Sequence, residues 1–259
     1  MAAESRARPG LRIQCSDCGS GVIGFHYDGS GRQTVIGVRQ GIMQKKRIEA
    51  DALILDVDGT LWDSTSIVAG AWTRAARENG FEDMTVEPDM LKGLFGMTMD
   101  DIARALVPGA SGEQREGLME KCVLYEQQAL ESDPCDICYP GVIDTIRKLS
   151  GRIGIAIVSN CQSGYIELFM EKTGLTAKEI HDRECFGDTG CGKADNILSV
   201  VKRNGYKNAY YVGDIDADRA SAREAGVGFI SAEYGFGDPT EADVRIDSFE
   251  ELSELIINR

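Results

Sequence analysis

The sequence of 259 residues contains no apolar run close to the ~20 residues that a membrane-spanning helix needs. It also lacks an N-terminal apolar stretch followed by a small-residue cleavage site, which argues against secretion. Basic residues are outnumbered, with 28 Lys and Arg against 42 Asp and Glu and a formal charge of −14. Nonspecific binding to nucleic acid or to an anionic membrane requires a net basic surface, so neither is expected. We therefore predict a cytoplasmic protein. We expect it to be a monomer or a homodimer.

No internal repeat and no low-complexity tract interrupts the chain. Hydrophobic residues make up 42% of the sequence, which is enough for a packed core. The length indicates one large domain or two smaller ones. In a reducing compartment, the eight cysteines are expected to be thiols rather than disulfides.

Residues 1–50 show no helical apolar period and are interpreted as an N-terminal extension. Two short apolar pieces, 22–25 and 34–38, flank Asp28-Gly29-Ser30-Gly31 and would suit a small hairpin. A flexible extension is the favoured interpretation, because chain ends of this composition are commonly poorly ordered.

From residue 51 onward, short apolar runs alternate with segments of helical period. The expected strands are 52–55, 153–158, 209–212, 227–231 and 244–246, and the expected helices are 142–149, 164–172, 194–203, 216–225 and 249–257. Apolar strands separated by crossover helices predict an α/β fold, with a Rossmann-like parallel sheet and helices on both faces.

The segment between the first two strands has a different character. Three helices are expected there, at 66–79, 99–106 and 112–130, with Pro108-Gly109 and Asp133-Pro134 between and after them. We interpret residues 64–138 as a helical cap inserted over the strand ends. Residues 51–63 and 139–259 would then form the core.

The most informative string is Asp56-Val57-Asp58-Gly59-Thr60, directly after the first strand. Two carboxylates two residues apart at a strand end can point into one site, while the glycine permits a tight turn. An Asp-rich turn without function is the simpler interpretation of such a string when it stands alone.

Three further motifs occur at later strand ends or helix starts. They are Ser159-Asn160, Lys193 after a Gly-Cys-Gly turn, and Gly213-Asp214 followed by Asp218. Ligands bind at the carboxyl ends of the strands in sheets of this kind, and a hydroxyl beside a helix start suits an anion. Each motif is weak alone, but together and in this order they are strong.

In this combination the chain resembles the haloacid dehalogenase-like hydrolase superfamily over about residues 51 to 250. Further strings resemble its phosphoglycolate phosphatase-like branch with a helical cap: Asp63-Ser64, Tyr139-Pro140-Gly141-Val142, Phe186-Gly187 and Ala225-Gly226-Val227. The resemblance implies a phosphatase that acts on a small phosphate ester, with phosphoglycolate as one suggestion.

The chemistry of the residues agrees with that implication. Asp56 would be the nucleophile that forms an aspartyl-phosphate, and Asp58 would act as general acid and then as general base. Ser159, Asn160 and Lys193 would bind the phosphoryl oxygens.

Several carboxylates beside a phosphate require a cation, and oxygen ligands favour Mg²⁺. The expected ligands are Asp56, the backbone carbonyl of Asp58, and Asp214, with Asp218 supporting or coordinating; Asp216 is a weaker competitor.

Two other functions stay open. A sugar phosphomutase of similar build would carry a His in the first cap helix, and the stretch 67–72 has none. A non-catalytic binding or regulatory member would usually have lost one of the first two aspartates, and both are present.

Specificity is expected to come from the cap. Trp62, the stretch Phe95-Gly96-Met97-Thr98 and Arg104 are candidates to line the site. For Phe95, Met97 and Met99, core packing between cap helices is the favoured alternative. The cap contains no cluster of Arg or Lys that would indicate a substrate with a carboxylate in addition to its phosphate.

Two CxxC pairs, Cys15/Cys18 and Cys135/Cys138, have a spacing that can chelate zinc. The two pairs lie far apart in the chain, so we do not expect them to form a four-cysteine zinc site, although the spacing would allow one.

Overall fold

The structure is a computed structural model that describes residues 24–27, 33–36 and 47–257. The chain divides into two units, residues 1–45 and 46–259. In the first, β1 (Gly24–Tyr27) pairs antiparallel with β2 (Gln33–Ile36), with Phe25 opposite Val35. This is the hairpin that the sequence left as the second interpretation of the N-terminal segment.

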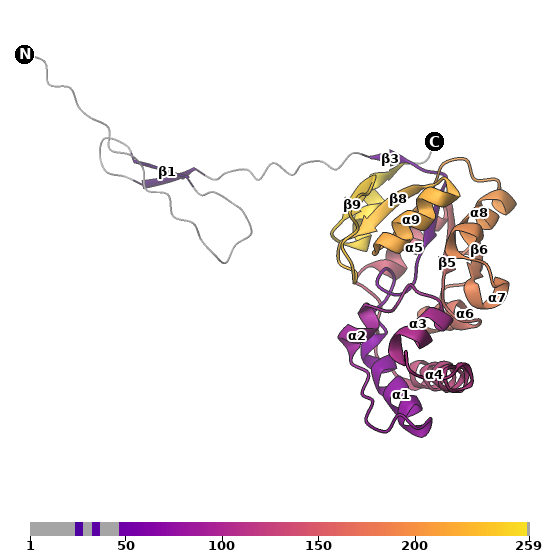
Figure 1. Ribbon diagram of the computed structural model, residues 1–259. Coiled ribbons are helices and arrows are strands. Elements are labelled where there is room, and N and C mark those ends of the chain that lie inside the picture. The colour runs from indigo at the N-terminus through magenta and orange to yellow at the C-terminus, as the bar shows by residue number, and fades with distance from the viewer. Residues whose placement is uncertain (1–23, 28–32, 37–46, 258–259) are drawn as a thin grey trace, which may run out of the picture. The chain divides into compact units, whose positions relative to one another are not determined.

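The second unit has an α/β core in which strands alternate with helices (Figure 1). Its elements in chain order are β3 (Ile48–Glu49), β4 (Ala52–Leu55), α5 (Val142–Ser150), β5 (Gly154–Ser159), α6 (Tyr165–Thr173), β6 (Asp182–Cys185), α7 (Phe186–Thr189), α8 (Lys193–Asn204), β7 (Ala209–Gly213), α9 (Asp216–Ala225), β8 (Gly228–Ala232), β9 (Val244–Ile246), a 3₁₀ turn (Phe249–Glu251), α10 (Leu252–Leu255) and β10 (Ile256–Ile257).

Six of these strands form one parallel sheet in the order β6-β5-β4-β7-β8-β9. Strand β4 is central, with Leu53 paired to Ile155 of β5 on one side and to Tyr210 of β7 on the other. The chain moves outward from β4 in one direction and then in the other, which is the Rossmann strand order. The predicted Rossmann-like α/β fold is confirmed.

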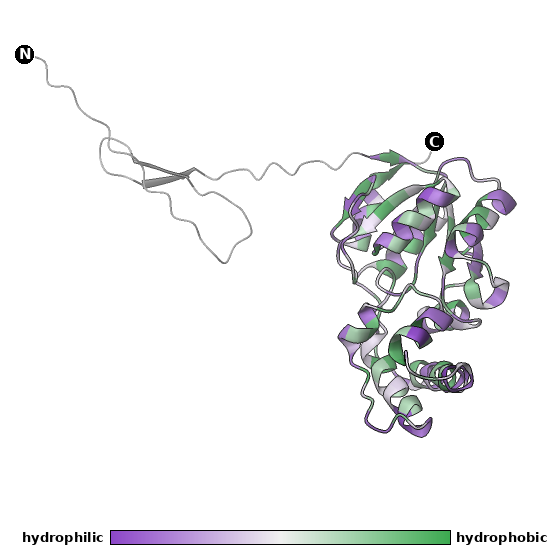
Figure 2. Cartoon of the chain, viewed as in Figure 1, coloured by the Kyte–Doolittle hydropathy of each residue, from purple (hydrophilic) through white to green (hydrophobic). Residues whose placement is uncertain are grey.

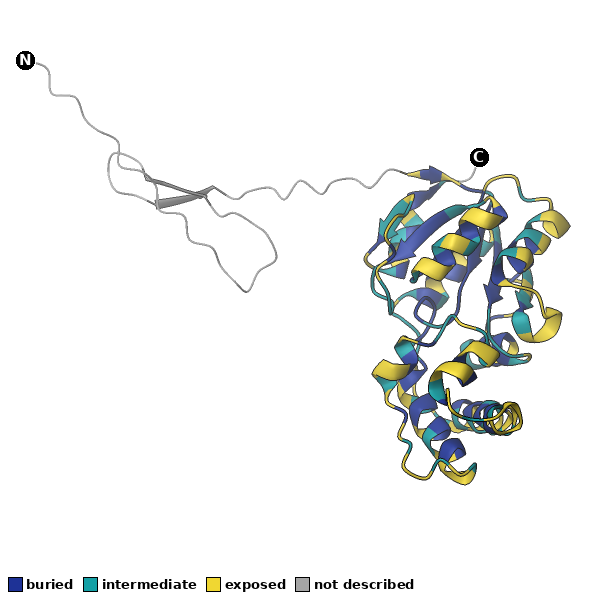
Figure 3. Ribbon diagram, in the orientation of Figure 1, coloured by how far each residue is buried: buried dark blue, intermediate teal, exposed yellow. Residues whose placement is uncertain are grey.

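The central strands are apolar throughout because both faces of the sheet are covered. Leu53 and Leu55 belong to one hydrophobic cluster, together with Ile146 of α5. Ala52 and Ile54 belong to a second cluster on the other face, which contains residues of α8 and α9. Figure 2 shows the strands as hydrophobic, and Figure 3 shows them as buried between helices with exposed outer sides. Alternate residues therefore pack into two separate cores.

Four helices lie between β4 and β5 in the chain: α1 (Thr65–Glu78), α2 (Pro88–Lys92), α3 (Met99–Leu106) and α4 (Gly112–Ser132). Helices α1 and α4 pack against each other. Helix α3 begins at the N-cap Thr98, whose hydroxyl accepts from Asp101 N, and α4 begins with a capping box between Ser111 and Gln114. We call α1–α4 the helical insertion.

Several elements differ from the sequence-based prediction, among them the short helices α2 and α7, which were not expected. Strand β6 was not expected, because Asp182-Arg183-Glu184-Cys185 has no apolar run; it is an edge strand, and Arg203 pairs with Asp182 and Glu184. The helix expected over 249–257 ends at Leu255, because the next two residues pair with β3. No helix in the described part of the chain has the length and apolar character needed to cross a membrane.

Candidate active site

The three central strands of the sheet bring polar residues to one edge. Leu55 is in register with Ile157 of β5 and with Val212 of β7, so the ends of these strands lie level. Asp56 follows β4 directly and its backbone N–H donates to Val212 O at 3.0 Å. Ser159 ends β5, and Asp214 follows β7; both side chains are buried, as is Asp56.

Lys193 is the first residue of α8, and its ammonium lies between two carboxylates. Nζ is 3.0 Å from Asp56 Oδ1 and 2.6 Å from Asp218 Oδ1. Burial alone would lower the pKa of Lys193, but the charges of Asp218 and Asp56 outweigh it and raise the pKa. The lysine therefore stays charged within the buried site.

Asp56, Asp214 and Asp218 offer carboxylate oxygens that all lie within 4.8 Å of one another. Asp214 is held by the Thr60 hydroxyl, which donates to Oδ1 at 3.2 Å, and by the Phe236 N–H, which donates to Oδ2 at 2.7 Å. Burial, with the charges of Asp218 and Asp56, raises the pKa of Asp214 to about 8.

Backbone approaches Asp214 so closely that only glycine fits beside it. Gly59 has φ +80°, and a Cβ there would lie 2.2 Å from Asp214 Oδ2. A Cβ on Gly235 would lie 2.3 Å from Asp214 Cβ and 2.4 Å from Gly59 O. Any larger residue at either position would displace the carboxylate.

Asp218 and Asp216, two residues apart, have different surroundings. Besides its contact with Lys193, Asp218 accepts from the N–H groups of Asp214 and Ile215 through Oδ2, at 3.0 and 3.2 Å, which fixes the start of α9. Asp216 is exposed and pairs with Arg219 at 2.8 Å. The structure thus places Asp218 within the group of three carboxylates and Asp216 outside it.

This donor set fits a small divalent cation. The ligands on offer are carboxylate oxygens, which Mg²⁺ prefers, and only one lysine offsets three buried acids. Asp56 Oδ1 is buried, and besides its ion pair with Lys193 no hydrogen-bond donor is aligned to it in the part of the chain that the structure describes. One lysine cannot neutralise three buried carboxylates, and uncompensated buried charge costs several kcal/mol, so a bound cation would stabilise the site.

Asp58 has its carboxylate turned toward a set of hydrogen-bond donors. Its Oδ1 accepts from Trp62 Nε1 at 3.1 Å, from the Ser64 hydroxyl at 2.8 Å and from the Tyr165 hydroxyl at 2.8 Å. Burial raises the pKa of Asp58 to about 7, although these donors lower it. A carboxyl with such a pKa can both give and take a proton near neutrality.

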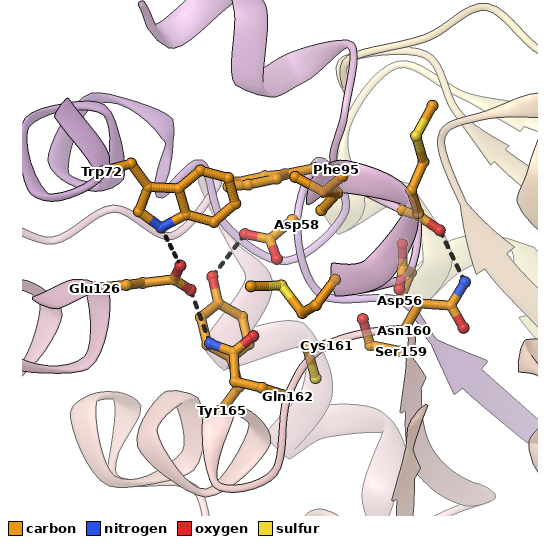
Figure 4. A pocket seen from close by; sticks show the side chains of 14 residues that line it. Asp56, Asp58, Trp72, Phe95, Glu126, Ser159, Asn160, Cys161, Gln162 and Tyr165 are labelled. Atoms are coloured by element: carbon orange, nitrogen blue, oxygen red, sulfur yellow. Dashed lines mark hydrogen bonds between the residues drawn. The ribbon is translucent and has the colours of Figure 1, made fainter. Parts of the chain in front are cut away.

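A small cavity of about 30 Å³ lies between the strand ends and the helical insertion. Figure 4 shows Asp56, Ser159 and Asn160 at one end of it, and Trp72 and Glu126 at the other. The insertion therefore closes directly over the strand ends. Helices α1 and α4 supply Trp72 and Glu126, respectively, to its wall.

Two of the three specificity candidates do not line this cavity. Trp62 is buried beneath Asp58 and orients it through the indole N–H. Arg104 is exposed, pairs with Asp101 at 2.7 Å, and lines an adjoining groove between α3, α4 and α7, which shares Met99, Cys161 and Gln162 with the cavity.

The loop before α3 lines the cavity and also packs against the core. Phe95, Met97 and Met99 line the cavity, and Phe95 and Met99 pack against the main hydrophobic core as well, so both interpretations hold for these two residues. Asn160 Nδ2 donates to Gly96 O at 2.8 Å, which joins this loop to the end of β5. Asn160 thus links the insertion to the core.

Glu126 is a site residue that the sequence did not reveal. It is 3% exposed, accepts from Trp72 Nε1 at 2.7 Å and from Gln162 Nε2 at 2.9 Å, and burial raises its pKa to about 7. A single Glu within an acidic helix carries no sequence signal that separates it from its exposed neighbours.

Only one of the two CxxC pairs considered for zinc lies within the described residues. Cys15 and Cys18 lie outside the described residues. Cys135 is exposed and Cys138 half-buried, and both are free thiols. Nothing in the described residues supports zinc at this pair.

The family model for the haloacid dehalogenase-like hydrolases matches residues 53–232. Phosphoglycolate phosphatase of Pseudomonas putida is 26% identical over 204 residues, which cover 74% of this chain and 73% of that protein. The enzyme of the same name from Rhodobacter capsulatus is 26% identical over 217 residues, covering 80% and 95%.

Solved structures agree in fold. CbbY of Rhodobacter sphaeroides, solved with xylulose-(1,5)bisphosphate, has a TM-score of 0.68 and 19% identity, covering 80% of this chain and all of that one. A haloacid dehalogenase-like family protein of Streptococcus pneumoniae has a TM-score of 0.66 and 19% identity, covering 76% and 94%.

The chain belongs to the haloacid dehalogenase-like hydrolase family. This confirms the family that the motifs indicated, and the two curated relatives support its phosphoglycolate phosphatase-like branch.

Proposed function

We propose that this protein is a Mg²⁺-dependent phosphatase that hydrolyses a small-molecule phosphate monoester through an aspartyl-phosphate on Asp56. The observation that carries the proposal is the position of the Asp56 carboxylate. It lies at a strand end, in contact with Lys193 and within 4.8 Å of the carboxylates of Asp214 and Asp218, and it lines the same cavity as Ser159.

The cation would be held by Asp56, Asp214 and the backbone carbonyl of Asp58. Asp218 supports this set by fixing Lys193 and the start of α9. When bound, Mg²⁺ supplies positive charge that offsets the phosphoryl oxygens and the crowded carboxylates.

In the first step, a carboxylate oxygen of Asp56 attacks phosphorus and the bond to the leaving oxygen breaks. Asp58 gives its proton to that oxygen. Its Oδ1 is occupied by three donors, which leaves Oδ2 to carry the proton. Lys193 and Ser159 compensate the charge of the phosphoryl group.

In the second step, Asp58, now ionised, takes a proton from a water molecule that attacks phosphorus and releases phosphate from Asp56. A carboxyl with a pKa of about 7 is present in both forms at neutral pH, which suits this double role. The cavity of about 30 Å³ holds only one or two water molecules, so the insertion must open to admit a substrate and then exclude bulk water.

The sugar phosphomutase alternative would require a second phosphorylated position on the substrate. No Lys, Arg or His is among the described residues that line the cavity, so no cationic side chain there would bind a second phosphate. This supports hydrolysis over transfer. The intact carboxylates likewise support catalysis over a purely regulatory role.

The direct experiment measures release of phosphate from p-nitrophenyl phosphate, with MgCl₂ and with excess EDTA. We expect turnover with Mg²⁺ and its loss with the chelator. A purified, folded protein that releases no phosphate from this ester or from a panel of small phosphate esters would refute the proposal.

A further inference from the structure

We propose that the wall of the cavity around Glu126 recognises an ammonium group on the leaving group of the substrate. This inference rests on the proposed phosphatase function and names the substrate class: a small phosphate ester of an amino alcohol. It predicts that a leaving group with a carboxylate, as in phosphoglycolate, is disfavoured.

The first argument is the position of Glu126 relative to the reacting end of the cavity. The same cavity is lined by Asp56 and Ser159 at one end and by Glu126 and Trp72 at the other (Figure 4). A phosphoryl group at Asp56 therefore directs its ester oxygen and leaving group toward Glu126.

The second argument is charge. The described cavity lining holds three carboxyl groups, Asp56, Asp58 and Glu126, and no Lys, Arg or His. The buried Lys193 is committed to Asp56 and Asp218 at the far end. A carboxylate on the leaving group would face a like charge without a compensating cation, whereas an ammonium would find an opposite charge.

The third argument is the hydrogen bonding of Glu126. Trp72 Nε1 donates to Oε2 and Gln162 Nε2 donates to Oε1, so both oxygens are held in place by one donor each. Each carboxylate oxygen can accept a second hydrogen bond. The site is thus an oriented acceptor, and an ammonium is a donor only.

The fourth argument is the aromatic surroundings. Trp72, Phe95 and Tyr165 line the cavity with Glu126, and Trp72 packs against Phe95 with ring centroids 6.2 Å apart. Aromatic faces attract cations, and a carboxylate combined with aromatic rings is a suitable environment for a desolvated ammonium.

Glu126 is close to three other titratable groups: Asp58 after β4, Tyr165 of α6, and Cys122 one turn earlier on α4. Burial keeps the pKa of Tyr165 and of Cys122 above the ordinary range, so both stay neutral. Asp58 adds negative charge when ionised. None of these neighbours neutralises Glu126.

The test compares three two-carbon phosphate esters that differ only in the terminal group: phosphoethanolamine with an ammonium, 2-hydroxyethyl phosphate with a hydroxyl, and phosphoglycolate with a carboxylate. The readout is kcat/KM for each ester with the full chain and MgCl₂ at pH 8. We expect the order ammonium, hydroxyl, carboxylate, with at least about tenfold between the first and the last.

The variant Glu126→Gln keeps the size of the side chain and removes its charge. We expect it to reduce the ammonium-to-carboxylate ratio by about tenfold or more. Glu131→Gln, at an exposed position on the same helix, is the matched control and should keep the wild-type ratio. A purely structural Glu126 would lower the melting temperature on substitution but would leave the ratio of the two esters unchanged.

Each outcome decides a separate point. A wild-type ratio of one or less overturns the inference by itself, even if the variant does not fold. A wild-type preference for the ammonium ester that persists in a folded Glu126→Gln overturns the role of Glu126. No turnover of any of the three esters, together with none of p-nitrophenyl phosphate, refutes the phosphatase proposal.

Discussion

The two ends of the cavity are built differently. At the strand ends, Asp56 and Asp214 lie on backbone whose position is fixed by the sheet, and their partners are Lys193 and backbone N–H groups. At the opposite end, Glu126 and Trp72 belong to helices of the insertion. The first end is charged and crowded, and the second is mainly aromatic with one carboxylate.

This difference indicates that the two ends of the cavity have different functions. The crowded end contains the groups that phosphoryl transfer needs whatever the alcohol, whereas the insertion end contacts only the leaving group. Changes at the first end should therefore reduce turnover of every ester, and changes at the second should alter the preference among esters.

The largest expected effect is at Asp56. Asp56→Asn removes the nucleophile and should lower kcat by more than ~10³-fold for all esters. Folding should be preserved, since the amide has the same shape and removes a buried charge. Burial, with the charge of Asp218, raises the pKa of Asp56 to about 6 although Lys193 lowers it. Phosphate release and thermal melting measure the two properties. Substantial turnover in a folded Asp56→Asn protein would exclude this nucleophile.

The second effect separates two aspartates of one loop. Asp214→Asn should raise the Mg²⁺ concentration for half-maximal activity by about 10–100-fold, because Asp214 belongs to the group of three carboxylates. Asp216→Asn is the control and should change it by less than about threefold, because Asp216 is exposed and paired with Arg219. A Mg²⁺ titration of phosphate release gives both values, and the opposite order would contradict our choice of ligand.

The catalytic end of the cavity could be read from the sequence for a physical reason. A buried parallel strand is a short apolar run, and a polar residue directly after it must lie at the sheet edge; this places Asp56, Ser159 and Asp214 together. The edge strand β6 was not predicted by this rule, because an edge strand with charged partners such as Arg203 needs no apolar run.

The insertion end could not be read in the same way. Whether Glu126 faces the cavity or solvent depends on how α4 packs against α1, and many acidic residues of α4 are exposed. The two interpretations of Phe95 and Met97 stayed open for the same reason: an apolar side chain between helices can fill a core, line a cavity or do both, and only the packing decides.

A third prediction sharpens the comparison through pH. Because burial raises the pKa of Glu126 to about 7, its negative charge is lost below that pH and gained above it. The kcat/KM ratio of phosphoethanolamine to phosphoglycolate should therefore rise from pH 6 to pH 8, by up to about tenfold. Asp58 titrates in the same range and adds negative charge to the same cavity, so it contributes to the rise in the same direction, whereas titration of the phosphoryl group affects both esters alike. In Glu126→Gln the rise of the ratio with pH should be clearly smaller than in the wild type; an equal slope in that variant would assign the pH dependence to Asp58 or another group.

The smallest expected effect is at Arg104, which lies on the insertion but outside the cavity. Its guanidinium is exposed, pairs with Asp101 at 2.7 Å and faces the groove between α3, α4 and α7. Exposed ion pairs of this kind contribute little, so Arg104→Gln should change kcat/KM of all three two-carbon esters by less than about twofold. A selective loss for phosphoglycolate would instead show that Arg104 reaches the leaving group when the insertion opens and closes. The insertion would then contact the leaving group through a basic residue as well as through Glu126. Specificity could in that case not be assigned to the Glu126 end of the cavity alone.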